Sequence, residues 1–140
     1  MVFPVITSAL LMAFASQPLG LSFLAFFGLV PILNIINNNT KLSVMLKIGL
    51  IWGTVYASTV IFWLAFNVGT STSVAFLTLI LAVGVISIGY GMIFFLFGIS
   101  IKKTSHLTGL YFFPFIWVSI EYLRSFGLLA FPWLDLANTQ

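Results

Sequence analysis

The sequence predicts an all-α membrane protein with roughly five transmembrane helices. Of its 140 residues, 61% are hydrophobic and only 5% are charged, whereas an average soluble domain has about 25% charged residues. Five basic and two acidic residues cannot cover a soluble fold of this size, and the uncovered apolar surface would aggregate in water. The composition therefore excludes a water-soluble monomer and indicates lipid as the solvent.

The excess of positive charge does not indicate a nucleic-acid-binding protein. The formal charge of +3 comes from five basic residues spread over the chain, and they form no basic stripe or aromatic-basic module. The absence of cysteine and the single histidine exclude a disulfide framework, a zinc site and a cysteine nucleophile within these residues. We therefore expect no metal, no cofactor and no nucleic-acid partner.

Four polar or turn-forming clusters divide the hydrophobic sequence into five helical segments. The clusters begin at Gln17, Asn37, Asn67 and Lys102, and crossing a bilayer as a helix takes roughly 20 apolar residues. The first segment is short for a crossing, so a tilted, re-entrant or thin crossing stays open. We expect helices over about 3–16, 19–36, 42–66, 72–101 and 107–124.

The third and fourth segments are expected to form a helical hairpin through the bilayer, since no charge occurs between Ile48 and Ile101. Four lysines lie where the hairpin begins and ends along the chain: Lys41, Lys47, Lys102 and Lys103. Because the hairpin crosses the bilayer twice, all four lysines lie on the same side of the membrane. The positive-inside rule makes that side cytoplasmic. We therefore expect a cytoplasmic N-terminus, a transmembrane bundle over residues 1–126, and a non-helical, exterior, interfacial loop over residues 127–140.

Small residues recur along the hairpin at spacings that suit close helix packing. Gly49 and Gly53 are four residues apart in the third segment, and Gly84, Gly89 and Gly91 lie in the fourth. Glycine is common in membrane helices, so we interpret these positions as generic packing faces rather than as a specific dimer contact.

Glu121 and Arg124 are the most informative polar residues. They lie three residues apart, so on a helix they share one face and can pair. Charged residues inside a membrane segment are functional candidates by default. The structural alternative is an ion pair that anchors the helix end at the interface, with Arg124 reaching the headgroups.

A short aromatic segment follows. It is too short to cross the bilayer again, and Pro132 removes a backbone donor, so the chain should leave the helix there. Phe131 and Trp133 suit the level of the lipid headgroups, where aromatic belts are common. Taken alone, they would indicate an ordinary aromatic belt.

The order of these residues resembles a family signature. Apolipoprotein N-acyltransferases carry the pattern E-[WY]-L-R-G, then G-F-P-W-L and a later Q, after an early stretch P-x-G-L-W-P-L-A-F and V-P-L-L. The chain matches the first pattern with Glu121-Tyr122-Leu123-Arg124, Phe131-Pro132-Trp133-Leu134 and Gln140, and the early stretch with Pro18-Leu19-Gly20-Leu21-Ser22-Phe23-Leu24-Ala25-Phe26 and Val30-Pro31-Ile32-Leu33. It departs from the family where Ser125 and Ala130 replace glycines and Ser22 replaces a tryptophan.

The resemblance implies the membrane-embedded N-terminal part of an enzyme of the bacterial inner membrane. Such enzymes transfer an acyl chain from a phospholipid to the α-amino group of the diacylglyceryl cysteine of a lipoprotein. Their nucleophilic cysteine, with glutamate and lysine partners, belongs to a nitrilase-like domain on the exterior side. Because these residues include no cysteine, we expect the chain to be inactive alone and to act with such a catalytic domain, which could be a separate partner.

The residues expected to position the phospholipid and the diacylglyceryl lipoprotein are Glu121, Arg124, Phe131, Pro132 and Trp133, and none is expected to be catalytic. Two other interpretations stay open. The chain could be a small polytopic membrane protein of another class, such as a transporter or assembly-subunit fragment, or the remnant of a disrupted gene. Two separated motifs in the correct order favour the acyltransferase.

Overall fold

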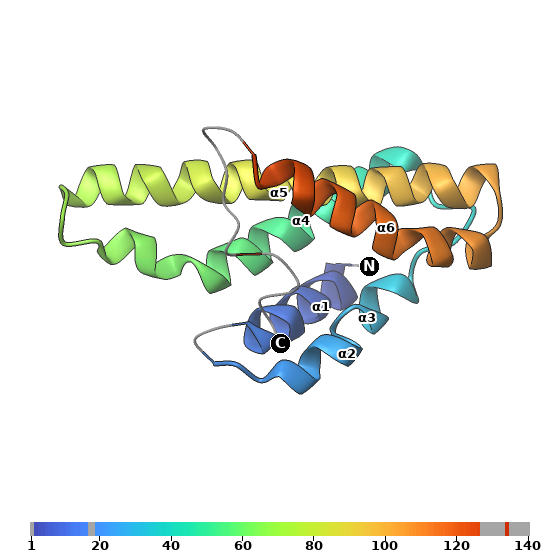
Figure 1. Ribbon diagram of the computed structural model, residues 1–140, viewed down its shortest axis with the longest axis horizontal. Coiled ribbons are helices and arrows are strands. Elements are labelled where there is room, and N and C mark those ends of the chain that lie inside the picture. Colours follow the sequence, from blue (N-terminus) through green and yellow to red (C-terminus); the bar gives the residue numbers. More distant parts are fainter. Residues whose placement is uncertain (1, 17–18, 127–133, 135–140) are drawn as a thin grey trace.

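The computed structural model describes residues 2–16, 19–126 and 134, and these residues form helices joined by turns, with no strand among them (Figure 1). The all-α fold class is therefore confirmed for the described part of the chain. The elements in chain order are α1 (Val2–Ala15), the 3₁₀ helix η1 (Ser22–Leu24), α2 (Ala25–Gly28), α3 (Val30–Leu33), α4 (Leu42–Val60), the 3₁₀ helix η2 (Phe62–Phe66), α5 (Thr72–Lys103) and α6 (His106–Arg124).

The α4–α5 hairpin is the long axis of the molecule (Figure 1). α4 has 19 residues and α5 has 32, and both are long and apolar enough to cross a membrane. Lys102 and Lys103 lie in the last turn of α5, where positive charge complements the helix dipole. The expected helix over 42–66 ends as α4 at Val60 and continues as the tighter η2, as helix ends commonly do.

Glycines bring the backbones of α4 and α5 into close approach. A methyl group added at Gly49 would lie 2.5 Å from the Tyr90 carbonyl oxygen, and one added at Gly53 would lie 2.8 Å from the Ser87 Cα. Thr54 and Ser87 add a hydrogen bond of 3.0 Å between their hydroxyl groups. The generic packing face expected at Gly49 and Gly53 is thus the α4–α5 contact of this same chain.

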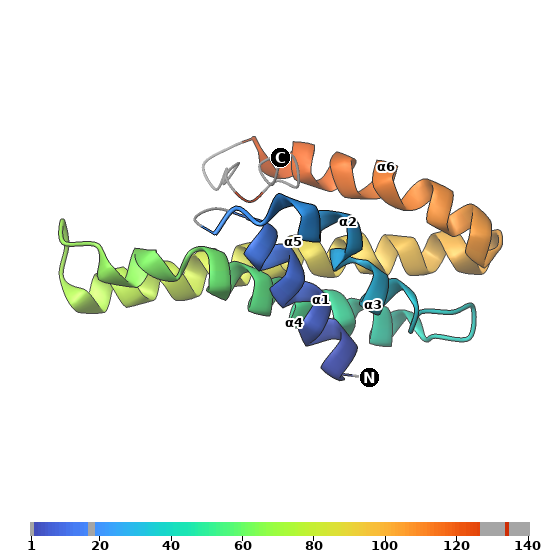
Figure 2. The same ribbon diagram turned by 90° about the horizontal axis from the view of Figure 1, so that it is seen from below.

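The expected single helix over 19–36 is replaced by η1, α2 and α3, which return antiparallel to α1 (Figures 1 and 2). The break follows from tertiary contacts that bring α1 close to Gly28. A methyl group there would lie 2.5 Å from the Met12 Sδ atom, and the Gly28 carbonyl accepts a 2.6 Å hydrogen bond from the Ser8 hydroxyl. Pro31, at the start of α3, also lacks the N–H that a continuous helix needs.

α6 packs along the lysine-bearing half of α5 (Figures 1 and 2). Its first turn is capped by Ser105, whose hydroxyl oxygen accepts a 3.1 Å hydrogen bond from the Thr108 N–H, a standard N-cap arrangement. The buried face repeats every three or four residues: Gly109, Phe113, Trp117, Ile120 and Glu121. Pro114 lies on the exposed face, so its ring does not disturb the contact with α5.

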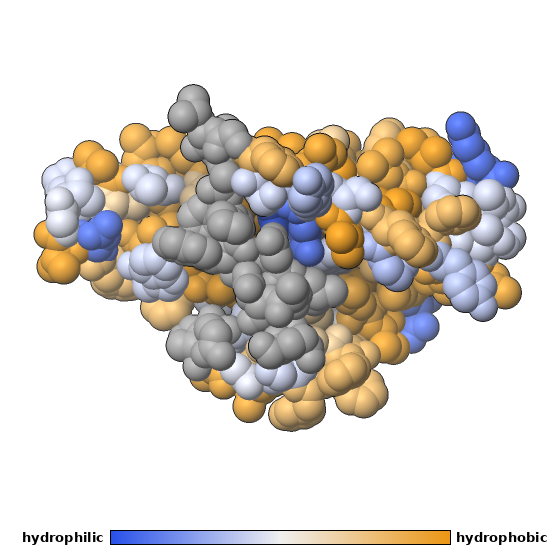
Figure 3. Space-filling model, viewed as in Figure 1, coloured by the Kyte–Doolittle hydropathy of each residue, from blue (hydrophilic) through white to orange (hydrophobic). Residues whose placement is uncertain are grey.

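Large apolar side chains cover much of the outside of the bundle (Figure 3). Phe26 is 75% exposed and Ile80 is 65% exposed, and similar residues occur on α1, α5 and α6. Such a surface marks a contact with lipid or protein rather than with water. Of the five expected crossings, α4 and α5 have the required length and hydropathy among the described residues, whereas α1 and the run Ser22–Leu33 are shorter. α6 has 19 residues, but it is not among the helices that are apolar enough to cross a membrane.

Gly49→Val should separate α4 from α5, because its side chain would collide with the Tyr90 backbone. Overpacking of this kind costs about 1–3 kcal/mol, so the free energy of unfolding measured by SDS titration in detergent should fall by that amount. Gly84→Ala is the matched control, since a methyl group at Gly84 meets no atom within 4 Å. Equal stability of the Gly49→Val variant and the control would contradict the close approach.

Candidate functional site

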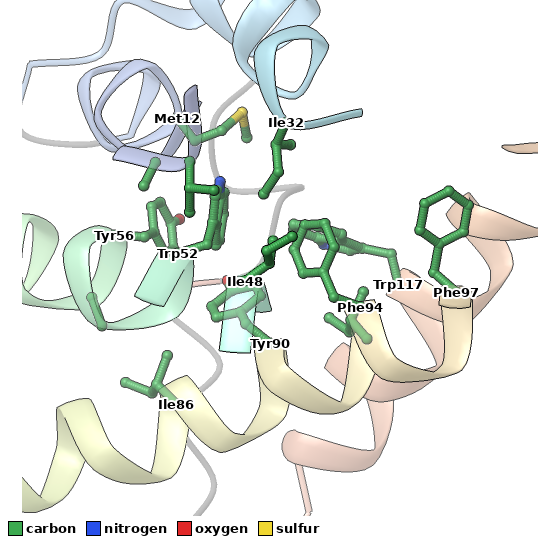
Figure 4. Close-up of a cluster of buried hydrophobic side chains, with 14 of the residues drawn as sticks. Met12, Ile32, Ile48, Trp52, Tyr56, Ile86, Tyr90, Phe94, Phe97 and Trp117 are labelled. Atoms are coloured by element: carbon green, nitrogen blue, oxygen red, sulfur yellow. The ribbon is translucent and has the colours of Figure 1, made fainter. Parts of the chain in front are cut away.

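An aromatic cluster fills the junction of α4, α5 and α6 (Figure 4). Trp52 at its centre is fully buried. Its ring stacks on Tyr56 with 5.0 Å between centroids and meets Tyr90 at 4.7 Å and Trp117 at 5.5 Å in edge-to-face geometry. Aromatic pairs favour such tilted geometries, so the four rings fix one another's orientation.

Buried hydrogen bonds tie this cluster to the N-terminal helices. The Trp52 Nε1–H donates to the Ser8 Oγ over 3.0 Å, while the Ser8 hydroxyl donates to the Gly28 carbonyl. The Tyr56 and Ser16 hydroxyl oxygens are 3.1 Å apart, at hydrogen-bond distance. Since a buried polar group without a partner is costly, these bonds select one arrangement of α1 and α2 on α4.

Glu121 lies at the inner face of α6, only 7% exposed. Its Oε1 atom accepts a 2.7 Å hydrogen bond from the Trp117 Nε1–H, one helical turn earlier. Glu121 stands out in the sequence as a charge in an apolar segment, whereas Trp117 does not. The available signal was the spacing of four residues, which places both side chains on one helix face.

Arg124 is half-buried at the end of α6. Its guanidinium carbon lies 5.1 Å from the centre of the Tyr90 ring, a cation–π distance. Gly89 leaves room for it, because a Cβ there would already be 3.7 Å from the Arg124 Cδ and Nη1 atoms. Figure 3 shows a small hydrophilic patch near the middle of this face of the molecule.

The site lies beside the interior of α5 rather than beside its end. At a rise of ~1.5 Å per residue, Tyr90 is about 27 Å from the first residue of α5 and about 20 Å from its last. Arg124, over the Tyr90 ring, shares this depth along the helix. Arg124 is thus the last residue of α6 but lies beside the interior of α5.

Tyr90 also contacts the segment that follows α6. Its hydroxyl donates a 3.1 Å hydrogen bond to the backbone carbonyl of Leu134, whose side chain is 1% exposed. Phe131, Pro132 and Trp133, the other expected site residues, lie outside the described residues. Sequence reasoning missed Tyr90, because a tyrosine among apolar helix residues carries no distinctive signal.

The site combines a buried carboxylate, a guanidinium over an aromatic ring, and the backbone carbonyl of Leu134. These features define an all-helical domain that holds a few charged groups inside an apolar bundle. A guanidinium in such a place suits a carboxylate or a phosphate.

The chain belongs to the apolipoprotein N-acyltransferase N-terminal domain family, whose family model matches residues 8–140. The resemblance seen in the sequence motifs is thus confirmed. No significant match is found among curated proteins or among solved structures.

Glu121→Leu should destabilise the bundle, since it leaves the buried Trp117 N–H without its carboxylate acceptor. An unsatisfied buried donor costs about 1–3 kcal/mol, and this loss is measurable by SDS titration in detergent. Glu121→Gln is the matched control, because its amide oxygen can still accept from Trp117, and it should lose less than half as much. Equal losses in the two variants would assign the stabilisation to charge rather than to the hydrogen bond.

Proposed function

We propose that this chain is the membrane-embedded, substrate-positioning part of an apolipoprotein N-acyltransferase of the bacterial inner membrane. Family membership over residues 8–140, the apolar surface and two helices able to cross a membrane support this role. The reaction moves an acyl chain from a phospholipid to the α-amino group of a diacylglyceryl cysteine. Its nucleophilic cysteine belongs to a nitrilase-like domain outside these residues, which contain no cysteine.

The proposed orientation places the lysine end of the hairpin in the cytoplasm. The lysines at that end are all exposed: Lys41, Lys47, Lys102 and Lys103. Positive charge is retained on the cytoplasmic side of membrane proteins. Because α1 and the run Ser22–Leu33 lie antiparallel, this pair returns the chain to the side on which it begins. The turn between α4 and α5 and residues 127–140 then face the exterior.

The observation that carries the proposal is the Arg124 guanidinium held over Tyr90, one helical turn from the buried Glu121. We propose that Arg124 binds the phosphate of the phospholipid donor, because a planar guanidinium suits a phosphate group. We propose that Phe131, Pro132 and Trp133 form the surface beneath the catalytic domain, with Trp133 at the depth of the lipid headgroups. Glu121 fixes the face of α6 from which Arg124 extends.

The catalytic domain and the membrane part would work in different environments. A thiol nucleophile is activated in a polar pocket, whereas the acyl donor and the lipid-anchored acceptor both lie in the bilayer. Holding the reacting groups together is worth several kcal/mol of activation barrier. The membrane part contributes to the rate by positioning, without a group that reacts.

Acyl transfer to a diacylglyceryl-peptide in phospholipid vesicles tests this function. The chain alone, a nitrilase-like partner alone and their mixture are compared, and only the mixture should be active. Activity of the chain alone would overturn the proposed mechanism, and inactivity of the mixture would overturn the proposed function.

Arg124→Ala should lower acyl transfer by the mixture about 10- to 100-fold, the range for losing a hydrogen bond to a charged group. Lys47→Ala is the matched control, because it removes one exposed positive charge from α4, and it should leave the rate unchanged. Trp133→Ala should also lower the rate. If Arg124→Ala and Trp133→Ala both leave the rate of acyl transfer unchanged, Arg124 does not bind the phosphate of the donor and only anchors the end of the helix.

A further inference from the structure

We propose that Tyr90 is the positioning residue of this site, and that it holds the Arg124 guanidinium and the Leu134 backbone at the same time. The inference rests on the proposed function for the identity of the Arg124 ligand, a phospholipid phosphate. It adds that two separate parts of one side chain, the Tyr90 ring face and the Tyr90 hydroxyl, hold Arg124 and the Leu134 carbonyl.

The hydroxyl group of Tyr90 supplies the first contact. It donates to the Leu134 carbonyl over 3.1 Å, and both residues are 1% exposed. A buried carbonyl that loses its donor costs free energy comparable to a lost hydrogen bond. This bond therefore fixes the position of Leu134 against α5.

The ring face of Tyr90 supplies the second contact, with the Arg124 guanidinium carbon 5.1 Å from its centre. A cation within about 6 Å of a ring centroid is attracted to the face of the aromatic ring. The Arg124 Nε and Nη1 atoms are buried, so we assign the phosphate contact to the Nη2–H groups. Support by Tyr90 is thus compatible with binding of a headgroup by the same arginine.

Neighbouring rings keep Tyr90 in one orientation. Trp52, Tyr56 and Trp117 surround it with centroid distances of 4.7, 5.5 and 5.4 Å. Rotation of the Tyr90 ring would move its hydroxyl away from Leu134 and its face away from Arg124 together. A headgroup bound at Arg124 and the chain at Leu134 therefore depend on one side chain.

The tether to Leu134 can be measured with a single thiol, since the chain has no cysteine. In the full chain in neutral detergent, Leu134→Cys keeps the backbone carbonyl that Tyr90 binds, and its reaction rate with a water-soluble maleimide reports exposure at this position. Adding Tyr90→Phe should raise that rate about fivefold, the effect of losing one hydrogen bond. Tyr111→Phe, at a tyrosine that is 70% exposed on α6, is the control and should not change it.

The position of Arg124 is tested by measuring the dissociation constant for phosphatidylglycerol of the full chain in neutral detergent. Gly89→Leu adds a side chain where a Cβ already lies 3.7 Å from Arg124, so it should weaken binding about tenfold without speeding the reaction at position 134. Gly89→Ala should bind normally. Tyr90→Phe keeps the ring face and should bind within about twofold of the unaltered chain.

The outcomes separate this inference from the proposed function. Phosphatidylglycerol binding that is unchanged by Arg124→Ala would overturn the assignment of the phosphate, while the maleimide rates would still report the tether. An unchanged maleimide rate in Tyr90→Phe would overturn the tether. Normal lipid binding in Gly89→Leu, when Arg124→Ala weakens it, would overturn the positioning of Arg124.

Discussion

Trp52 holds three parts of the bundle at one point. Its indole N–H binds Ser8 of α1, its ring stacks on Tyr56 of the same helix, and its edges meet Tyr90 of α5 and Trp117 of α6. Between helices in lipid the hydrophobic effect supplies little driving force, so close packing and buried hydrogen bonds must hold them. The contacts of Trp52 are of both kinds, and the close approach of α4 to α5 makes them possible.

The candidate site depends on this packing. Tyr90 is held by Trp52 and in turn contacts Arg124 and Leu134. Trp117 is held by the same cluster and binds Glu121. Each charged group of α6 therefore contacts an aromatic ring whose orientation is set by the other helices. Preorganisation of this kind lets a site orient a ligand without rearranging when it binds.

Composition and the charge-free stretch from Ile48 to Ile101 predicted the helical fold and its long hairpin, because burial in lipid forces the backbone into helices. The break between residues 19 and 36 was not predicted, since it follows from contacts of Gly28 with α1. Glu121 and Arg124 stood out as charges in an apolar segment. Tyr90 could not, because its role comes from neighbours distant in sequence, such as Leu134.

Membrane topology is the most direct test of the central claim, that α4 and α5 form a transmembrane hairpin in an inner-membrane protein. Single cysteines at Gly69, in the turn between α4 and α5, and at Lys103, the last residue of α5, can be labelled with a membrane-impermeant maleimide in spheroplasts. We expect labelling of Gly69→Cys from outside and of Lys103→Cys only after permeabilisation. Labelling of both from the same side, or extraction of the chain by carbonate, would contradict the account.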